Sequence, residues 1–137
     1  TVFDDLKAAL KDADIVTTLT PSRKGFVQNS FLLPGCLVNA IGADAPGKRE
    51  LDISVLASAG MIVYDEWEQC SHSGETQYLS EADRKATLFS LGDIVTHPGW
   101  EYTNDDRMMT TVFDATGLAI EDVATARYIL EKVVISS

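Results

Sequence analysis

Apolar residues fall in two alternating patterns along this chain. Short runs rich in β-branched residues are typical of buried strands, whereas apolar residues spaced three or four positions apart are typical of amphipathic helices. The predicted strands are residues 15–20, 36–41, 61–64 and 110–114, and the predicted helices are residues 2–12, 51–59 and 119–133. Residues 70–93 show a weaker helical pattern without clear bounds.

The four predicted strands are apolar on both faces and alternate with helices. This combination predicts an α/β fold with three layers, in which a mostly parallel sheet of about four strands carries helices on both faces. Ligands of such sheets bind beyond the carboxyl ends of the strands. Three loops should lie at that edge, residues 20–25, 42–49 and 115–117.

Charge excludes two classes of partner. The 137 residues include 11 basic and 21 acidic side chains, a formal net charge of −10, which disfavours binding to nucleic acid or to an anionic membrane surface. Residues 1–60 hold six basic and seven acidic residues, whereas residues 61–137 hold five and fourteen. An anionic ligand is therefore expected near the first half of the chain.

Composition predicts one ordinary globular domain over residues 1–137, because 45% of the residues are hydrophobic and the length suits a single core. No apolar run approaches the ~20 residues of a membrane-spanning helix, and no basic-then-apolar leader opens the chain. We therefore expect a cytoplasmic protein. Cys36 and Cys70 lie in or beside apolar runs, which favours buried reduced thiols over a disulfide.

Asp44 is the first candidate for chemistry, since it follows a predicted strand and precedes the chain-bending residues Pro46 and Gly47. One interpretation is a turn aspartate that bonds to its own backbone, a common use of Asp at such positions. The other is a carboxylate that faces a ligand and acts as a general base. Lys48, four residues later, could bind a phosphate or keep Asp44 ionised, although surface lysines usually do neither.

Two threonines begin the other loops. Thr116 precedes a helix whose first turn holds Glu121 and Asp122, a pattern that helix capping alone explains. An exposed helix N-terminus could also present backbone donors to a ligand. Thr20, before Pro21, fits either a plain turn or a loop that folds over a nucleotide.

Other polar residues favour structural roles. The two histidines, His72 and His97, are far apart and lack the ligand spacing of a metal site, so no metal is expected. Cys36 has no recognisable base beside it. The acidic residues of segment 65–68 are most simply a solvated rim.

Four passages together resemble a known family. They are residues 13–22 (ADIVTTLTPS), residues 34–51 with their Pro-Gly and NAIGADAPGKREL, the tripeptide Ser73-Gly74-Glu75, and residues 112–122 (VFDATGLAIED). The chain is similar to the C-terminal part of the NAD(P)-binding domain in the ornithine cyclodeaminase and mu-crystallin family. That family includes an alanine dehydrogenase and ketimine reductases, and the resemblance implies a partial Rossmann-like fold.

The resemblance also implies site residues. Asp44 matches the catalytic acid or base beside the nicotinamide, and Thr116 matches a position near the substrate. The positions matched to cofactor contacts are Thr20, Ile41, Gly42, Ala43, Lys48 and Ala115. At Ala115 many relatives have a serine, so its hydrogen bond would be missing here. Residues 97–107 differ from the sequence that is usual in the family, with Trp100 where an arginine is common.

The implied cofactor is NAD(H) or NADP(H). Relatives seat its pyrophosphate on a Gly-x-Gly-x-x-Gly turn in the first βαβ unit, and the nine glycines of this chain never form that turn. The resemblance therefore implies the C-terminal half of such a domain, as a fragment or a shortened gene product, and we expect this chain alone to bind NAD weakly or not at all. Strand 15–20 would then be an uncovered edge, which predicts a homodimer through that edge or neighbouring helix faces.

Three functions remain open from the sequence. The first is NAD(P)-dependent amino-acid cyclodeaminase, dehydrogenase or ketimine reductase chemistry, incomplete in this chain alone. The second is a non-catalytic oligomeric binding module that retains the fold. The third is a small-molecule binder unrelated to dinucleotides that uses the crevice near Asp44. The substrate and the choice between NAD and NADP stay undetermined.

Overall fold

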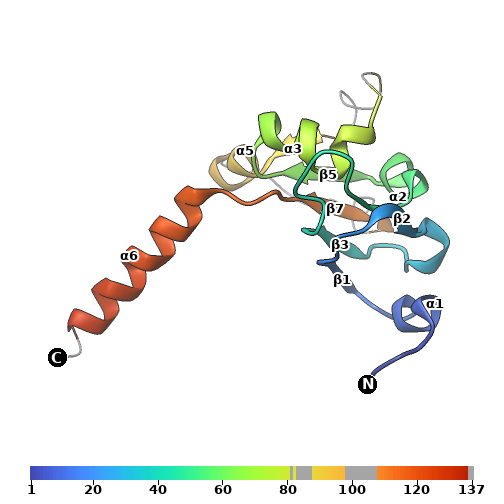
Figure 1. Ribbon diagram of the computed structural model, residues 1–137, viewed down its shortest axis with the longest axis horizontal. Helices are drawn as coiled ribbons and strands as arrows, with labels where there is room; N and C mark the ends of the chain where they lie inside the picture. Colours follow the sequence, from blue (N-terminus) through green and yellow to red (C-terminus); the bar gives the residue numbers. More distant parts are fainter. Residues whose placement is uncertain (81, 83–87, 98–107, 136–137) are drawn as a thin grey trace.

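A five-stranded parallel sheet is the centre of the computed structural model, which describes residues 1–80, 82, 88–97 and 108–135. Its strand order is β1-β3-β7-β5-β6, and every pairing within it is parallel (Figure 1). The strands are β1 (Ile15–Thr18), β3 (Leu37–Ala40), β7 (Thr111–Asp114), β5 (Met61–Tyr64) and β6 (Leu88–Ser90). The predicted α/β fold is confirmed, with one strand more than the sequence suggested.

Helices, 3-10 turns and a second, smaller sheet make up the rest of the described structure. The helices are α1 (Leu6–Leu10), α2 (Ile53–Ser58), α3 (Trp67–Ser73), α5 (Leu91–Thr96) and α6 (Ala119–Ile135), with 3-10 turns η1 (Asn29–Phe31) and η2 (Glu75–Tyr78). The second sheet pairs β2 (Arg23–Val27) with β4 (Arg49–Leu51) in parallel. Sequence patterns missed this sheet, because β2 contains Arg23, Lys24 and Gly25 in place of a β-branched run.

Side-chain caps set the starts of two helices later than the periodicity predicted. The Asp5 carboxylate accepts the Ala8 N–H at 2.8 Å, so α1 begins at Leu6 rather than near residue 2. The Asp52 carboxylate accepts the Ser54 N–H at 3.0 Å, so α2 begins at Ile53. An N-cap carboxylate satisfies a backbone donor that has no partner within the helix.

The hydrophobic core lies on one face of the main sheet. The pairing register aligns Val16, Val38, Val112 and Ile62 in one row across four strands, and all four are at most 5% exposed. Residues from α1, α2 and the second sheet pack against this row. Burial of this row against those elements is the main apolar contribution to the stability of the fold.

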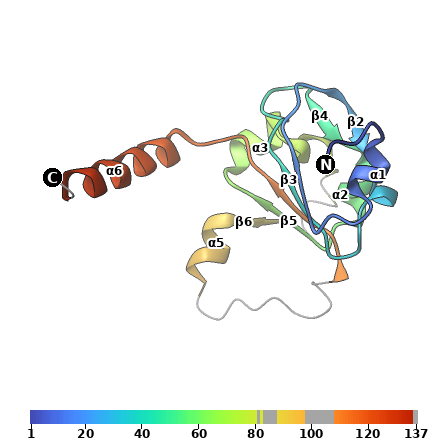
Figure 2. The same cartoon turned by 90° about the horizontal axis from the view of Figure 1, so that it is seen from below.

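Helices lie on both faces of the sheet, as predicted, although the face opposite the core is only partly covered. Ile15 on β1 is 63% exposed, and α5 lies on this side, away from α1 and α2 (Figure 2). Between α5 and the sheet is an open apolar cavity of about 490 Å³, lined by Leu37, Asn39, Met61, Val63, Leu91, Ile94, Thr111 and Phe113.

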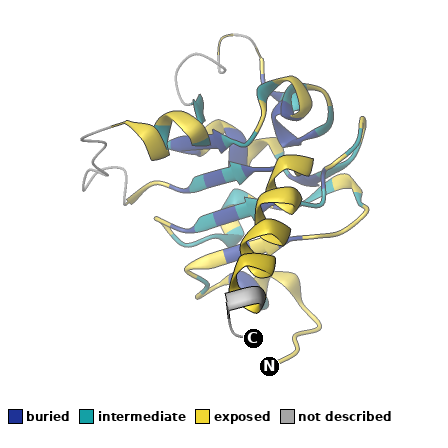
Figure 3. Ribbon diagram, turned by 90° about the vertical axis from the view of Figure 1, so that its left-hand side faces the viewer, coloured by how far each residue is buried: buried dark blue, intermediate teal, exposed yellow. Residues whose placement is uncertain are grey.

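Helix α6 extends away from the sheet (Figures 1 and 2), and its described residues are coloured as exposed in Figure 3. Its large apolar residues are 54–69% exposed, namely Ile120, Val123, Tyr128, Ile129, Leu130 and Val133. The predicted helix is confirmed, yet its apolar side chains do not enter the core. No helix within the described residues is long and apolar enough to cross a membrane.

Candidate functional site

The carboxyl ends of β1, β3 and β7 bring three loops to one edge of the sheet. Ile41 and Gly42, which follow β3, donate their N–H groups to the Thr18 carbonyl of β1 at 3.1 and 3.0 Å. Ala115, which follows β7, donates its N–H to the Ala40 carbonyl of β3 at 3.2 Å. Because the strands are parallel, this is the edge at which α/β sheets bind ligands.

A buried carboxylate joins the first two of these loops. Glu50, on β4, is 0% exposed, and it accepts the N–H groups of Thr20 at 2.5 Å and Gly42 at 2.9 Å. A Cβ atom at Gly42 would lie 2.5 Å from the Thr20 carbonyl oxygen and 2.5 Å from Glu50 Oε2. Glycine at position 42 is therefore what lets the two loops approach so closely.

Asp44 lies in the second loop with its carboxylate accessible to solvent. Its side chain is 50% exposed, and it forms an ion pair with Lys48, whose side chain is 22% exposed. The hydrogen bond from Lys48 lowers the pKa of Asp44 below its ordinary value. In the open loop Asp44 is therefore ionised at neutral pH, and a ligand that excluded water from it would favour proton uptake.

Turn η2 holds the far end of the same loop. Gly47 donates its N–H to the side-chain oxygen of Gln77 at 3.0 Å, and the Gln77 amide donates to the Lys48 carbonyl at 3.3 Å. The Tyr78 hydroxyl donates to the same carbonyl at 3.1 Å, and the Arg49 guanidinium lies over the Tyr78 ring, 4.8 Å from its centroid. The Asp44 loop is thus fixed from both sides.

The third loop is held by Asp65, which follows β5. Its Oδ2 atom accepts the N–H groups of Thr116 at 3.0 Å and Gly117 at 2.9 Å, and its Oδ1 atom accepts the Cys70 thiol at 2.9 Å. The Thr116 hydroxyl donates to Gln69 Oε1 at 3.2 Å. Asp65 is therefore a structural anchor, which corrects its interpretation as part of a solvated rim.

The two cysteines are free and buried, as predicted. Burial raises the pKa of the Cys36 thiol, and it raises the pKa of Cys70 to about 12. A protonated thiol is a poor nucleophile, so neither residue suits covalent catalysis. Cys70 lies on α3, and not in or beside a strand as its apolar surroundings suggested.

Three carboxyl groups lie buried beneath the loops, and Glu50, Glu75 and Asp114 are each 0% exposed. Asp114 accepts the N–H groups of Glu75 at 3.0 Å and Thr76 at 2.8 Å. Glu75 Oε1 accepts the N–H groups of Glu50 at 2.5 Å and Leu51 at 3.1 Å. Burial raises the pKa of Glu75 to about 7 and that of Asp114 to about 6. Among the described residues, no three His, Cys, Asp or Glu side chains are grouped to hold a metal ion.

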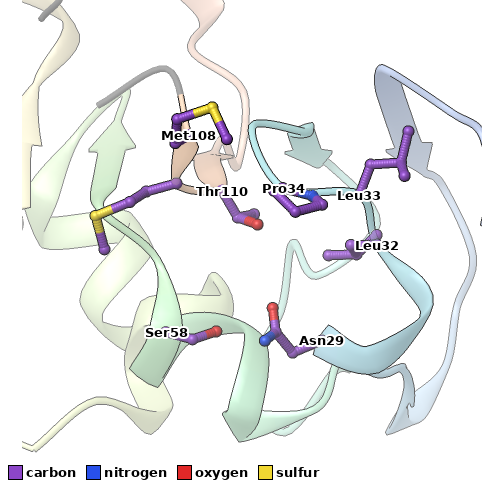
Figure 4. A pocket seen from close by; sticks show the side chains of 8 residues that line it. Asn29, Leu32, Leu33, Pro34, Ser58, Met108 and Thr110 are labelled. Carbon is purple, nitrogen blue, oxygen red and sulfur yellow. The ribbon is translucent and has the colours of Figure 1, made fainter. Parts of the chain in front are cut away.

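A second cavity lies at the other end of β7 (Figure 4). It measures about 230 Å³ and is lined by Asn29, Leu32, Leu33, Pro34, Ser58, Met108, Met109 and Thr110. Thr110 precedes β7, whereas the loop with Ala115 follows it. This cavity is therefore separate from the Asp44 edge.

The whole chain is similar to one known protein family. The model of the ornithine cyclodeaminase/mu-crystallin family matches residues 1–137. The chain belongs to this family. Alanine dehydrogenase of Archaeoglobus fulgidus is 39% identical over 124 residues, which are 86% of this chain and 37% of that protein.

Solved structures of family members share the fold. An archaeal alanine dehydrogenase dimer with bound NAD has a TM-score of 0.73 and 36% identity, covering 90% of this chain and 38% of that one. Δ1-pyrroline-2-carboxylate reductase of Thermococcus litoralis, in complex with NADH and L-proline, has a TM-score of 0.80 and 25% identity, covering 98% and 42%. The chain therefore spans less than half the length of the relatives it matches.

The structure collects most of the family-matched residues at the edge with the three loops. Thr20, Ile41 and Gly42 meet through the Thr18 carbonyl and the Glu50 carboxylate, and Asp44 and Lys48 form their pair a few residues further on. Of the remaining matched residues, Ala43 and Ala115 are buried and Thr116 is half-buried. Residues 98–107, including Trp100, lie outside the described residues.

Sequence reasoning missed the groups that hold this edge together. Glu50, which precedes the predicted helix 51–59, is fully buried. A signal existed, because Glu50 directly precedes the apolar Leu51 and Asp114 closes the apolar run of β7. An acid beside such a run needs donors when it is buried, and the unpaired N–H groups at strand ends supply them.

Proposed function

We propose that the loops after β1, β3 and β7 form one side of a nicotinamide dinucleotide site, in which Asp44 transfers the proton of an amino-acid or imine oxidoreduction. The observation that carries this proposal is the Asp44–Lys48 ion pair, with the Asp44 carboxylate accessible to solvent, at the carboxyl edge of the parallel sheet. Glu50 fixes the loop that carries the pair. A positioned, accessible carboxylate is what general acid–base catalysis requires.

The residues matched to cofactor contacts at this edge are proposed to hold an NAD(H) or NADP(H) molecule. Lys48 offers a cation to an anionic cofactor, and Thr20, Ile41, Gly42 and Ala43 would line its nicotinamide side. When bound, the nicotinamide supplies hydride transfer to or from the substrate carbon. Asp44 would hold or release the accompanying proton, and Thr116 would lie near the substrate. Cyclodeaminase, dehydrogenase and ketimine reductase reactions all need these two transfers.

This chain alone is proposed to supply only part of that site. Its 137 residues contain no Gly-x-Gly-x-x-Gly sequence, the turn whose backbone donors and helix N-terminus bind the pyrophosphate in Rossmann folds. Affinity for NADH should therefore be weak, with a dissociation constant of about 1 mM or higher.

A homodimer is the proposed assembly. β1 is an edge strand of the main sheet, with Ile15 63% exposed and Leu19 69% exposed. Exposed strand edges and apolar side chains favour association. The same surfaces favour the second candidate function, a non-catalytic oligomeric module that retains the fold.

A chimera tests the catalytic proposal. In it, this chain replaces the matching segment of the alanine dehydrogenase from Archaeoglobus fulgidus, and NADH formation from L-alanine is followed by absorbance. Asp44→Asn should lower kcat by roughly 100-fold or more, with little change in affinity for NAD. The matched control is Asp12→Asn, an exposed aspartate outside the site. An Asp44→Asn chimera as active as the control would refute the assigned role.

A further inference from the structure

Turn η2 forms several hydrogen bonds with the Asp44 loop and with the residues that flank it. Glu75, its first residue, is 0% exposed, and its Oε1 atom accepts two N–H groups of β4, those of Glu50 and Leu51. The neighbouring Arg49 N–H donates instead to the carbonyl of Ser22, the residue before β2, at 2.9 Å. The Glu75 carboxyl group thus takes the place of a strand partner.

The position of Glu75 is itself fixed from β7. Asp114 accepts the N–H groups of Glu75 and Thr76 at the start of the turn. A Cβ atom at Gly74 would lie 2.5 Å from Asp114 Oδ2, so glycine is needed for this approach. The carboxyl end of β7 therefore anchors η2.

Two routes lead from η2 to Asp44. The first runs through Glu50, whose backbone is held by Glu75 and whose carboxylate holds the Gly42 N–H at 2.9 Å, two residues before Asp44. The second runs through Gln77, which bonds to the Gly47 N–H and to the Lys48 carbonyl. Both backbone flanks of the Asp44–Lys48 pair are attached to one turn of four residues.

We propose that Glu75 and Gln77 are positioning residues, which orient the loop bearing Asp44 and Lys48 through hydrogen bonds to its two flanks. In this arrangement the acceptor oxygen of Glu75 matters more than a negative charge. Its second oxygen, Oε2, is buried and has no hydrogen-bond partner among the described residues, so a negative charge on this group would be poorly stabilised. The proposal rests on the proposed function only in treating Asp44 as the reacting group.

The test uses the 137-residue chain and two NMR measurements, neither of which involves cofactor or turnover. The first is the pKa of Asp44, which Lys48 lowers in the native loop. The second is amide hydrogen exchange at Gly42 and Gly47. An Asp44→Asn chimera as active as its control would thus contradict the proposed function and leave this test unaffected.

Glu75→Ala removes the acceptor, and Glu75→Gln keeps it without charge. We expect Glu75→Ala to return the pKa of Asp44 toward its ordinary value and to accelerate exchange at Gly42 roughly ten-fold or more, while exchange at Ile62 in β5 is unchanged. Glu75→Gln should behave as the native chain. Equal behaviour of the Ala and Gln variants, or no effect of either, would overturn the role of Glu75.

Gln77→Ala keeps the proposal falsifiable if Glu75→Ala does not fold. Gln77 is only half-buried, so its truncation should leave the core folded, accelerate exchange at Gly47 roughly ten-fold, and shift the pKa of Asp44 in the same direction. The matched control is Glu68→Ala on α3, an exposed residue that should change neither measurement. A Gln77→Ala chain indistinguishable from this control would contradict the proposal.

Discussion

The carboxyl group of Glu75 accepts the backbone N–H of Glu50 at 2.5 Å, and Glu50 in turn closes the loops after β1 and β3 with its own carboxylate. A buried acid in a strand is therefore held by a second buried acid in a turn. Both are tolerated because each accepts backbone N–H groups that would otherwise be unpaired. This pair links the interior of the fold to the edge where Asp44 lies.

The raised pKa of Glu75 predicts a pH dependence of stability. Its pKa is about 7 in the folded chain against an ordinary value of 4.5, so the folded state binds the proton more tightly than the unfolded state. The stabilisation is complete below about pH 4.5 and is lost as the pH rises through about 7. A shift of this size corresponds to about 3 kcal/mol.

Glu75→Gln removes this titration while keeping the acceptor oxygen. Between about pH 4.5 and pH 8, the free energy of unfolding of the native chain should fall by about 3 kcal/mol more than that of the variant. Urea denaturation at a series of pH values measures the difference. Asp114, whose pKa is about 6, titrates in both proteins. Parallel pH profiles for the two proteins would show that Glu75 is ionised in the fold.

Gly42→Ala should destabilise the fold and separate the first two loops. The added Cβ would lie 2.5 Å from both the Thr20 carbonyl and Glu50 Oε2, and overpacking of this kind costs about 1–3 kcal/mol. Thermal and urea unfolding measure the loss. Gly92→Ala on α5 is the matched control, because its nearest contact is Ser90 Oγ at 3.3 Å; it should change stability by no more than about 1 kcal/mol. Equal stabilities of the two variants would contradict the close approach at Gly42.

Asp65→Ala should loosen the loop after β7. It leaves the N–H groups of Thr116 and Gly117 without their carboxylate acceptor, at an expected cost of about 1–3 kcal/mol in the free energy of unfolding. Glu68→Ala, which removes an exposed acid from the same segment, should change it by less than about 0.5 kcal/mol. If both substitutions were equally mild, segment 65–68 would be the solvated rim that its sequence suggested.

Self-association can be assigned to a surface by sedimentation velocity. We expect a dimer at micromolar concentration, and a chain lacking residues 119–137 distinguishes the two candidate surfaces. A dimer that survives this deletion forms through the β1 edge, whereas one that is lost forms through α6, whose apolar residues are exposed. A monomeric native chain would rule out both.

Most of the main sheet was predictable, because four of its strands have a local sequence pattern typical of buried strands. The segments now seen as β1, β3, β5 and β7 are β-branched or apolar runs bounded by turn residues, a composition typical of the strands of a parallel α/β sheet. The resemblance to the family then indicated Asp44, Lys48 and Thr20 as candidate site residues, and the structure brings their loops to one edge of the sheet. Strands β2 and β6 are not β-branched runs, so the same pattern does not predict them.

The buried acids were not predictable by the same means. Hydrophobic periodicity treats Glu50, Glu75 and Asp114 as polar positions, and polar positions are usually exposed. Whether a carboxylate can be buried depends on unpaired N–H groups from other elements, such as those of Thr20 and Gly42 for Glu50. That arrangement exists only once the chain has folded. The tripeptide Ser73-Gly74-Glu75 is part of the resemblance to the family, but its sequence gives no physical reason for Gly74. The structure shows that glycine is needed there because the residue lies beside Asp114.

The central claim is that the Asp44 edge is one side of a nicotinamide dinucleotide site, and NADH titration of the isotope-labelled chain by NMR tests it most directly. We predict saturable amide shifts at Thr20, Gly42, Asp44, Lys48 and Thr116, with a dissociation constant of about 1 mM or higher, and no shift at Asn29 in the second cavity. Shifts confined to other surfaces would contradict the account.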